Sequence, residues 1–496
     1  MHLANHAAGR KIVALLLGAL SVTAFAPFDC FPVIWLTLAG LFALLNRSVE
    51  NQESPRDGAL IAWAFGFGFF IAGVSWLYVS LSTFGGMPAA VAGFATLLFC
   101  AAMALYPALA GALFIRFAPA GGWRRGVFFA ALWALTEWLR GWLLTGFPWL
   151  AVGYSQTPPS PLAGFAALFG VYGTSLITAL IATLLHCMTQ PGKRWQGIVS
   201  LVSIALCGAL LAKHAWTTPE GEPMRVALLQ GNVAQDIKWR PENFEASLRT
   251  YYRLMHDNPA QLTVLPETAL PVFLHQVPGD YLDELKRLAA RQNGDLLFGI
   301  VTGSPEGYAN SAVSIGASGR QHYDKSHLVP FGEYIPPGFA WFMAMAHIPM
   351  SSFTPGQPVQ PAMRINGHRI AINICYEDAF GEEIIRALPE ATLLLNISNV
   401  AWFGDSLAPP QHLQIARMRA LETGRMMLRA TNTGMTAIIG ANGHVLDALK
   451  PFSRGALMAE VRSYAGTTPY VRWGNWPATT FSLVLLAFAR RRKALS

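Results

Sequence analysis

The sequence predicts a protein of two parts: an α-helical membrane bundle of about eight spans and an extramembrane α/β domain. Three observations predict it. Charged residues make up only 13% of the chain, whereas about 25% is usual in soluble proteins. The deficit is concentrated in residues 1–213, whose acidic residues are Asp29, Glu50, Glu53, Asp57 and Glu137. From about residue 219 to 472, by contrast, short apolar runs alternate with amphipathic stretches, as in a soluble domain.

Long apolar stretches define the membrane part, because a helix of about 20 mainly apolar residues can cross a bilayer. The stretches that fit lie near 11–27, 32–46, 59–80, 87–116, 124–145, 162–188, 195–213 and 474–490. The fourth is long enough to tilt or to break at Pro107. We therefore expect seven spans in residues 1–213, an extramembrane domain in 219–472, and a final span with a basic tail in 474–496.

The positive charges between these stretches predict the orientation. They fall in alternate loops and at the ends, at Arg10, Lys11, Arg47, Arg56, Arg116, Arg124, Arg125, Lys193, Arg194 and Arg490 to Lys493. By the positive-inside rule both termini are cytoplasmic and the α/β domain lies outside. A cleaved signal peptide ending at Ala24-Phe25-Ala26 is the alternative for the first stretch, and it also leaves the α/β domain outside.

The distribution of charge also indicates which binding partners and contacts to expect. The net charge is +8, but no basic run falls on a predicted soluble helix or loop, so we expect no nucleic acid partner. Within the spans, Glu137 and Arg140 share one helix face and predict an ion pair, since unpaired charges there are unfavourable. Gly66 and Gly68 predict close helix packing rather than a nucleotide-binding loop.

The pattern between residues 224 and 470 predicts the architecture of the soluble domain. Strands are expected at 224–233, 262–267, 296–303, 311–317, 368–377, 392–399 and 436–441, and helices at 242–256, 279–292, 381–388 and 410–424. Strands that are apolar throughout are covered on both faces, so helices should cover the outer faces of the sheets. Asn442-Gly443 predicts a hairpin. The stretch 330–356, rich in Pro, Met and aromatic residues, predicts a functional loop that contacts lipid, with Phe339, Trp341 and Phe342 as contacts.

Cysteine usage gives the first indication of chemistry. Cys30, Cys100, Cys187 and Cys207 fall in or beside the spans, so Cys375 is the single cysteine of the soluble domain. A lone cysteine is usually an inert, buried, small apolar residue. Cys375, however, ends an apolar strand, which is where α/β folds present reactive side chains. We therefore treat it as a candidate nucleophile.

A thiol nucleophile requires a base and a group that stabilises negative charge. Glu267 ends another apolar strand and is the candidate base, although a glutamate at a surface turn is more common. Lys325 is the candidate oxyanion partner, and its alternative is a solvated charge beside Asp324.

Together these segments resemble a known family. The stretches LPET (265–268), YDKSHLVPFGEY (323–334) and NICYED (373–378) are similar, in order and spacing, to those of the nitrilase superfamily. The resemblance implies an αββα sandwich and a Cys-Glu-Lys triad of Cys375, Glu267 and Lys325. It also implies attack of the cysteine on a C–N or ester bond, with a thioester intermediate.

The flanking spans extend this resemblance to the whole chain. Seven spans, an external nitrilase-like domain and one closing span resemble the apolipoprotein N-acyltransferases of the bacterial inner membrane. Local stretches agree, among them STFGGMP (82–88), LRGWLLTGFPWL (139–150), SNVAWFGDS (398–406) and ARMRALETGR (416–425). The resemblance implies a ping-pong reaction in the periplasm. Cys375 takes an acyl chain from a phospholipid, typically phosphatidylethanolamine, and passes it to the α-amino group of a diacylglyceryl-cysteine at a lipoprotein N-terminus.

Further residues match family positions near the site. Glu333, Tyr376 and Glu377 are expected to support catalysis, although both glutamates could equally form a structural ion pair that positions Lys325. Trp239, Asn310 and Trp402 are expected to shape the substrate site. One position departs from the family pattern: Val400 stands where an aspartate is usual.

Two other hypotheses remain open at this stage. A membrane-anchored amidase or phospholipase could use the same triad, and a transporter or scaffold could carry an inactive enzyme domain. Transporters, however, place polar groups or broken helices at mid-membrane, and these spans are poor in charge. The scattered histidines and single soluble cysteine lack metal-ligand spacing, so we expect no metal and no cofactor. We also expect a monomer.

Overall fold

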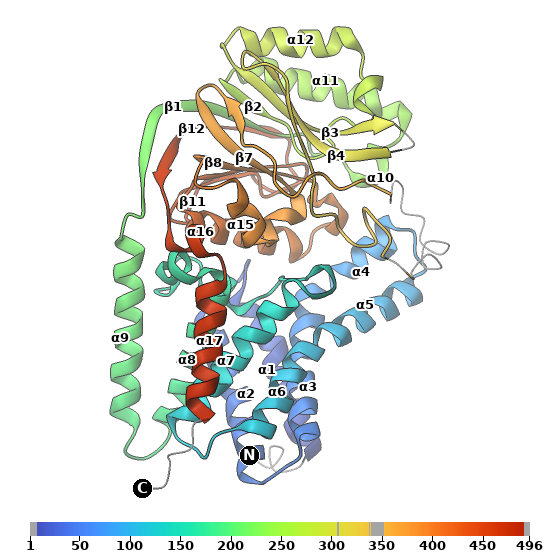
Figure 1. Ribbon diagram of the computed structural model, residues 1–496. Helices are drawn as coiled ribbons and strands as arrows, with labels where there is room; N and C mark the ends of the chain where they lie inside the picture. Colours follow the sequence, from blue (N-terminus) through green and yellow to red (C-terminus); the bar gives the residue numbers. More distant parts are fainter. Residues whose placement is uncertain (1–6, 305–306, 337, 339–351, 491–496) are drawn as a thin grey trace. The chain divides into compact units, whose positions relative to one another are not determined.

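The computed structural model describes residues 7–304, 307–336, 338 and 352–490 (Figure 1). The chain forms two compact units. The first, here the helical unit, comprises Met1–Tyr78, Ala89–Ala215 and Arg472–Ser496. The second, here the sandwich unit, comprises Val79–Pro88 and Trp216–Val471. The short segment 79–88, which joins two apolar helices in sequence, thus belongs to the sandwich unit.

The helices of the helical unit follow the apolar stretches. They are α1 (Ala7–Ser21), α2 (Pro32–Glu50), α3 (Pro55–Val74), α5 (Ala89–Met103), α6 (Leu105–Phe117), α7 (Trp123–Arg140), α8 (Ala166–Met188), α9 (Arg194–Lys213) and α17 (Trp476–Arg490). The fourth stretch breaks at Ala104 rather than at Pro107, which lies in the first turn of α6. Proline is tolerated there because the first-turn N–H groups have no partner within the helix.

Some of these helices are long enough to span a membrane. Among the described residues, Pro32–Glu50, Pro55–Val74, Ala89–Phe117, Ala163–Met188 and Arg194–Lys213 are long and apolar enough to cross a bilayer. The helices α1 and α17 are 15 residues each, and α7 begins with two arginines. The helices match the eight predicted apolar stretches in position, and five segments of the described residues also meet the length and composition of a membrane span.

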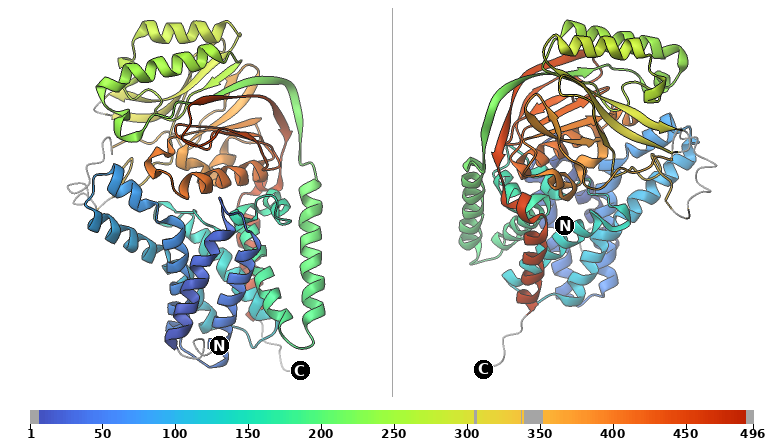
Figure 2. Two further views of the ribbon diagram at one scale, coloured as in Figure 1. Left: turned by 180° about the vertical axis from the view of Figure 1, so that it is seen from behind. Right: turned by 45° about the horizontal axis from the view of Figure 1, so that its top comes forward.

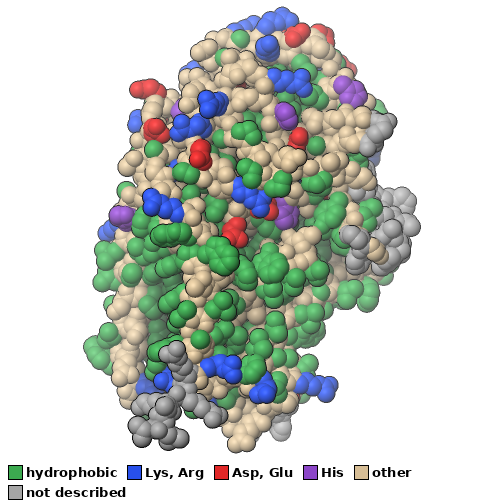
Figure 3. Space-filling view, in the orientation of Figure 1, with side chains coloured by type: hydrophobic (Ala, Val, Ile, Leu, Met, Phe, Trp, Pro, Cys, Tyr) green, Lys and Arg blue, Asp and Glu red, His purple; other side chains and the backbone are tan. Residues whose placement is uncertain are grey.

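The outer surface of the helical unit is apolar. Leu16, Leu36, Phe94, Leu98, Leu206, Leu210 and Val484 are among its exposed large side chains, and hydrophobic side chains cover much of this unit in Figure 3. Soluble proteins rarely expose apolar patches of more than a few hundred Å². Lipid is the solvent that makes such a surface favourable, and the chain is a membrane protein.

Glycines allow the helices of this unit to approach closely. A side chain on Gly68 of α3 would overlap the carbonyl group of Leu15 in α1, and one on Gly18 would overlap that of Phe65. Gly66 lies against Ala104, just before α6, and Pro107 in its first turn. The predicted role of Gly66 and Gly68 in helix packing is confirmed.

Glu137 and Arg140 anchor one irregular segment of the helical unit. Arg140 donates to the carbonyl oxygens of Phe147 and Trp149 at 2.5 and 2.6 Å. Glu137 accepts the backbone N–H of Val152 at 3.0 Å. The predicted ion pair is not among the salt bridges of the described residues. Both side chains instead satisfy backbone groups that would otherwise be buried without partners.

The sandwich unit contains two six-stranded sheets. The first has the order β12 (Gly455–Gly466), β1 (Thr217–Gln230), β2 (Leu262–Val264), β3 (Asp295–Ser304), β4 (Gly307–Gly316) and β5 (Gln321–Asp324). The second has the order β11 (Val445–Ala448), β10 (Ala437–Ile439), β9 (Met427–Thr431), β8 (Leu393–Ser398), β7 (His368–Ile374) and β6 (Met363–Ile365). The central pairs are parallel in both sheets: β1–β2–β3 and β7–β8–β9.

The two sheets face each other across a hydrophobic core, as alternation along the strands requires. Val226 and Leu228 of β1 point into the core between the sheets, with Ile372, Leu395 and Leu428 of the second sheet. The intervening Ala227 and Leu229 pack outward against α11 (Pro241–Asp257) and α12 (Gly279–Ala290). On the opposite side, α15 (Ala408–Thr423) covers the second sheet (Figures 1 and 2). The predicted αββα sandwich is confirmed.

Most expected elements are present. Each predicted strand and helix corresponds to an observed one, and the Asn442-Gly443 hairpin joins β10 to β11, with Ile439 opposite Val445. The strands β5, β6, β9, β11 and β12 were not predicted. Of these, β5, β6 and β11 are four residues long or shorter, β12 mixes buried and exposed positions, and β9 is buried throughout. Residues 337 and 339–351 of the predicted 330–356 loop, with Phe339, Trp341 and Phe342, lie outside the described residues.

Candidate active site

Cys375 occupies a sharp turn at the end of a buried strand. The strand β7 ends at Ile374, and a 3-10 turn, η8, runs from Cys375 to Ala379. Cys375 has a positive φ of 54°, a conformation that is unfavourable for a residue with a side chain and persists only where surrounding contacts impose it. The side chain is half-buried. The turn therefore fixes the direction of the thiol at some conformational strain.

Lys325 brings two carboxylates together. It directly follows β5, and its ammonium nitrogen is 2.8 Å from Glu333 and 3.6 Å from Oε1 of Glu267. Lys325 is 1% exposed and Glu267 6% exposed. A buried cation of this kind requires compensating charge, and the two glutamates supply it.

Two further groups hold Glu267. Asn310 donates from Nδ2 to Oε1 of Glu267 at 2.8 Å and to Oε1 of Glu333 at 2.9 Å. The backbone N–H of Asn399 donates to Oε2 of Glu267 at 2.7 Å. Both oxygens of the carboxylate are therefore oriented, and Asn310, predicted to shape the substrate site, lies between the two carboxylates.

The electrostatics link this cluster to Cys375. Burial alone would lower the pKa of Lys325, but Glu333, Glu267 and the sulfur of Cys375 together raise it above its usual range. Burial raises the pKa of the Cys375 thiol, Glu267 raises it further, and Lys325 opposes this rise. The resting site thus combines a neutral thiol with a firmly charged ammonium group.

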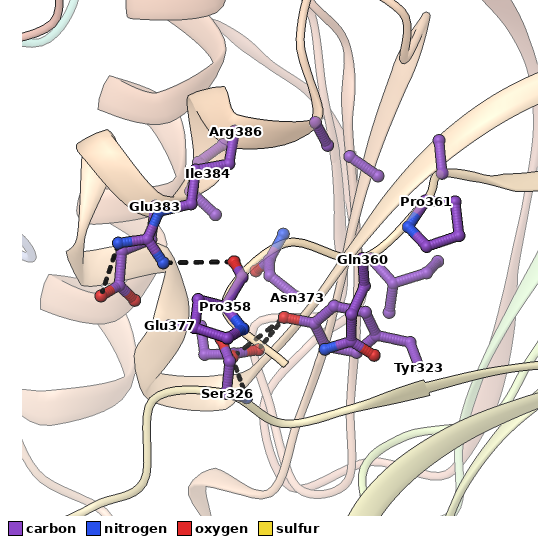
Figure 4. Close-up of a pocket in the computed structure, with 14 residues that line it drawn as sticks. Tyr323, Ser326, Pro358, Gln360, Pro361, Asn373, Glu377, Glu383, Ile384 and Arg386 are labelled. Atoms are coloured by element: carbon purple, nitrogen blue, oxygen red, sulfur yellow. Dashed lines mark hydrogen bonds and ion pairs between the residues drawn. The ribbon is translucent and has the colours of Figure 1, made fainter. Parts of the chain in front are cut away.

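Glu377 binds the segment that carries Lys325 to the segment that carries Cys375. Its carboxylate accepts the backbone N–H groups of Ser326 at 2.7 Å and of Ile374 at 2.7 Å, and the hydroxyl of Tyr323 at 3.0 Å (Figure 4). Burial raises the pKa of Glu377, and the backbone donors counteract that rise. Glu377 thus positions the Lys325 segment through hydrogen bonds. The ion pair that the structural alternative expected is made by Glu333.

The aromatic candidates lie on segments that neighbour this cluster. The ring of Tyr376 meets Phe380 edge-on at 5.0 Å. Trp239 ends the short helix α10 (Gln235–Lys238). Trp402 lies three residues after Asn399, and its ring packs edge-on against Phe84 at 6.3 Å. Val400, where the family pattern has an aspartate, is 1% exposed and adds an apolar side chain beside Asn399.

Sequence reasoning missed two contributors. Lys238 is 2% exposed and donates to the hydroxyl of Thr268 at 2.7 Å and to the carbonyl of Glu267 at 3.3 Å. Asn399 contributes through its backbone, which no sequence motif reveals. The spacing of residues cannot distinguish a buried lysine from a surface lysine. The available signal for Lys238 was its position next to Trp239.

The fold and this site define a class. Two six-stranded sheets lie between helices, and one edge carries a cysteine in a strained turn beside a Glu–Lys–Glu cluster. The family model for Carbon-nitrogen hydrolase matches residues 225–470. The sandwich unit is thus a carbon-nitrogen hydrolase domain.

The remainder of the chain specifies the family further. The model for the Apolipoprotein N-acyltransferase N-terminal domain matches residues 17–184. An apolipoprotein N-acyltransferase of Nitrosomonas europaea is 49% identical over 98% of this chain and 99% of its own length. The corresponding protein of Ralstonia nicotianae is 45% identical over 97% of this chain and 94% of its own length. The chain belongs to the apolipoprotein N-acyltransferase family. It is a membrane acyltransferase, and its substrates are an acyl donor and a lipoprotein acceptor.

Proposed function

We propose that the chain transfers an acyl group from a phospholipid, through a thioester on Cys375, to the α-amino group of the diacylglyceryl-cysteine at a lipoprotein N-terminus. The observation that carries the proposal is the charge arrangement beside the cysteine. A buried ammonium group lies between Glu333 and Glu267, and it interacts electrostatically with the Cys375 sulfur. The arrangement provides a base, Glu267, and a cation, Lys325, that can stabilise an oxyanion.

The first half-reaction forms the thioester. Because burial keeps the thiol of Cys375 protonated, attack requires a base at the moment of reaction. Glu267 takes the thiol proton as the sulfur attacks the ester carbonyl carbon. Lys325 and the backbone N–H of Tyr376 stabilise the tetrahedral oxyanion. The intermediate collapses, the lysophospholipid alkoxide leaves, and Glu267 returns the proton to it.

The second half-reaction transfers the acyl group. The free α-amino group attacks the thioester carbonyl carbon, and Glu267 takes a proton from the nitrogen. The C–S bond breaks as the amide forms, and the proton returns to the sulfur of Cys375. Glu333 neutralises Lys325, while Trp239, Asn310 and Trp402 border the substrate site. The thioester must be shielded from water, or hydrolysis would replace transfer.

We further propose the location of this chemistry. The basic residues between the apolar helices favour cytoplasmic termini and a periplasmic catalytic domain at the bacterial inner membrane. In agreement, α1 begins and α17 ends at the same end of the helical unit (Figures 1 and 2). Residues 219–472 would form the catalytic domain, flanked by spans in 1–213 and 474–496. Phosphatidylethanolamine is the proposed donor, and the chain acts as a monomer.

A single experiment tests the thioester. The purified full chain is incubated with vesicles of phosphatidylethanolamine and phosphatidylglycerol without acceptor, and its peptides are mapped by mass spectrometry. We expect an acyl adduct on Cys375 that hydroxylamine removes and that Cys375→Ala lacks. The four remaining cysteines are internal controls. An unmodified Cys375 with intact lipid would refute the proposal.

Adding a diacylated peptide with a free N-terminus tests the acceptor. We expect the adduct to disappear as the peptide gains one acyl chain, and the same peptide with a blocked N-terminus should leave the adduct in place. Release of free fatty acid at an equal rate with either peptide would instead support the membrane-anchored phospholipase or amidase hypothesis.

A further inference from the structure

A buried polar network lies behind the strained turn at Cys375, outside the triad. It consists of Asp378 in η8, Asn396 in β8, His412 in α15 and Arg429 in β9. Each of these side chains is 2% exposed or less. Burying four polar side chains, two of them oppositely charged, is unfavourable unless their hydrogen bonds are made. The contacts they make converge on the backbone of Cys375.

Two of these side chains reach the carbonyl oxygen of Cys375. Asn396 donates to it from Nδ2 at 3.1 Å, and Nε2 of His412 lies 3.2 Å from it. The residue they contact has the positive φ of 54° described above. A carbonyl oxygen held by two donors fixes the peptide plane that follows Cys375, and that plane carries the N–H of Tyr376.

The orientation of both donors follows from Arg429. Its Nη1 group donates at 2.9 Å to Oδ2 of Asp378 and at 2.9 Å to Oδ1 of Asn396. Because Oδ1 of Asn396 accepts from Arg429, its Nδ2 is left as the donor, and it donates to Oδ1 of Asn373 at 2.6 Å and to the Cys375 carbonyl at 3.1 Å. Asp378 forms an ion pair with Arg429 at 2.9 Å, and the oxygens of a carboxylate paired in this way accept hydrogen bonds.

The same logic assigns the tautomer of His412. Its Nε2 atom lies 2.7 Å from Oδ1 of Asp378 and faces the Cys375 carbonyl as well. Both partners are acceptors, so Nε2 carries the hydrogen. Burial lowers the pKa of His412, Arg429 lowers it further, and Asp378 counteracts these effects. The imidazole is therefore a neutral, fixed donor.

We propose that His412 and Asn396 are positioning residues for the nucleophile, oriented by Arg429 and Asp378. They maintain the strained turn that aims the thiol of Cys375 at the acyl carbon and the N–H of Tyr376 at the oxyanion that develops beside it. This inference rests on the proposed function, since it assumes that Cys375 is acylated. Misplacing a reacting group by about 1 Å can slow a reaction by about 10²-fold. The effect belongs to the rate of acylation, not to lipid binding.

A pair of amide substitutions tests the role of the Nε2 donor. In His412→Gln the amide nitrogen can reach the position of Nε2, whereas in His412→Asn it is too short to do so. The full chain is mixed with vesicles of phosphatidylethanolamine and phosphatidylglycerol, and the rate of acyl adduct formation on Cys375 is measured against lipid concentration. We expect His412→Asn to lower the maximal rate by about 10²-fold, and His412→Gln by less than about tenfold, with unchanged half-saturation.

The control is His368→Asn. His368 is the second buried histidine of the described sandwich, and it contacts Ser463 at 2.7 Å rather than Cys375. We expect a lower thermal midpoint and an unchanged acylation rate. Equal rates for wild type and His412→Asn would overturn the inference, and so would equal losses in the Asn and Gln variants.

Two further outcomes are separated by the same assay. If the wild type itself forms no adduct on Cys375, the proposed function fails and not this inference alone. If neither His412 variant folds, Asn396→Ala decides, because it removes the other donor. A slowed acylation with unchanged half-saturation supports the positioning role, and a wild-type rate overturns it.

Discussion

The ammonium group of Lys325 lies 2.8 Å from Glu333 and 3.6 Å from Oε1 of Glu267. The cation thus makes its closer contact with the carboxylate that is not the proposed base. This asymmetry leaves Glu267 available to take a proton, while Lys325 stays charged for the oxyanion. Asn310 separates the two carboxylates and donates to both.

Removing Glu333, the nearer counter-ion of Lys325, should therefore disable Glu267 as the base. In Glu333→Gln the cation loses its nearer partner and should shift toward Glu267, which would then resist protonation. We expect the rate of Cys375 acylation to fall by about 10²-fold, the lower end of the range for loss of general-base catalysis. Glu245→Gln removes an exposed i,i+4 pair with Arg249 and should leave the rate unchanged. A wild-type rate in Glu333→Gln would show that this counter-ion is dispensable.

Asn310 offers a nearly isosteric test of the same cluster. Asn310→Asp removes the shared donor and places a third carboxylate between Glu267 and Glu333. Like charges at this distance repel each other, so we expect a larger loss of acylation than in Asn310→Ala. The measurement is the single-turnover rate on vesicles at fixed pH. Equal losses in the two variants would mean that the donor, which both lack, and not the charge balance, is the important feature.

Lys238 predicts a dependence of stability on pH. Burial lowers its pKa to about 7, and Glu267 counteracts this effect. Because the pKa is lower in the folded than in the unfolded chain, the folded state binds fewer protons between about pH 7 and 10, and stability rises with pH across that window. The slope is at most about 1.4 kcal/mol per pH unit. It vanishes below about pH 7, where Lys238 is charged in both states and its burial destabilises the fold most.

The variant Lys238→Met isolates this contribution. We expect the thermal midpoint of the wild type, relative to the variant, to increase from pH 7 to pH 9, since the variant lacks the titrating amine. Measuring the difference between the two chains removes the contributions of other groups. A difference that stays constant across this range would contradict a neutral Lys238 amine.

Phe84 and Trp402 should be energetically coupled. Their rings meet edge-on at 6.3 Å and join the 79–88 segment to the turn after β8. Edge-to-face pairs contribute about 0.5–1.5 kcal/mol beyond their buried area. A double-mutant cycle with Phe84→Leu and Trp402→Leu, followed by thermal unfolding, should give a coupling energy of that size. Strict additivity would mean that the contact does not stabilise the unit.

Helix packing in the helical unit gives a final prediction. Gly68→Ala places a methyl group against the Leu15 backbone, whereas Gly93→Ala in α5 meets no atom within 4 Å. Overpacking of this kind destabilises by about 1–3 kcal/mol, so we expect Gly68→Ala to lower the thermal midpoint in detergent. Gly93→Ala should leave it unchanged or raise it slightly, because alanine favours helix. Similar midpoints for both variants would argue against close packing of α1 and α3.

Local patterns in the sequence were sufficient to predict the architecture. Apolar length predicted the helices of the membrane part, and continuous apolar runs predicted the central strands of both sheets, because each of these signals arises within a few residues. The strands β9 and β12 escaped prediction for the opposite reason. Their stability comes from partners distant in the chain, such as β1 for β12, and Arg429 occurs in a buried strand only because Asp378 and Asn396 receive it.

The site divides in the same way. The sequence by itself determined Cys375, Glu267 and Lys325 as candidates, because each ends or follows a predicted strand and belongs to a distinctive motif. Only the tertiary structure decided which groups orient them. Asn310, Asn399, Lys238 and His412 act through hydrogen bonds between segments that are separated by 29 to 132 residues. Such contacts depend on the packing of the two sheets and leave no periodic signal in the chain.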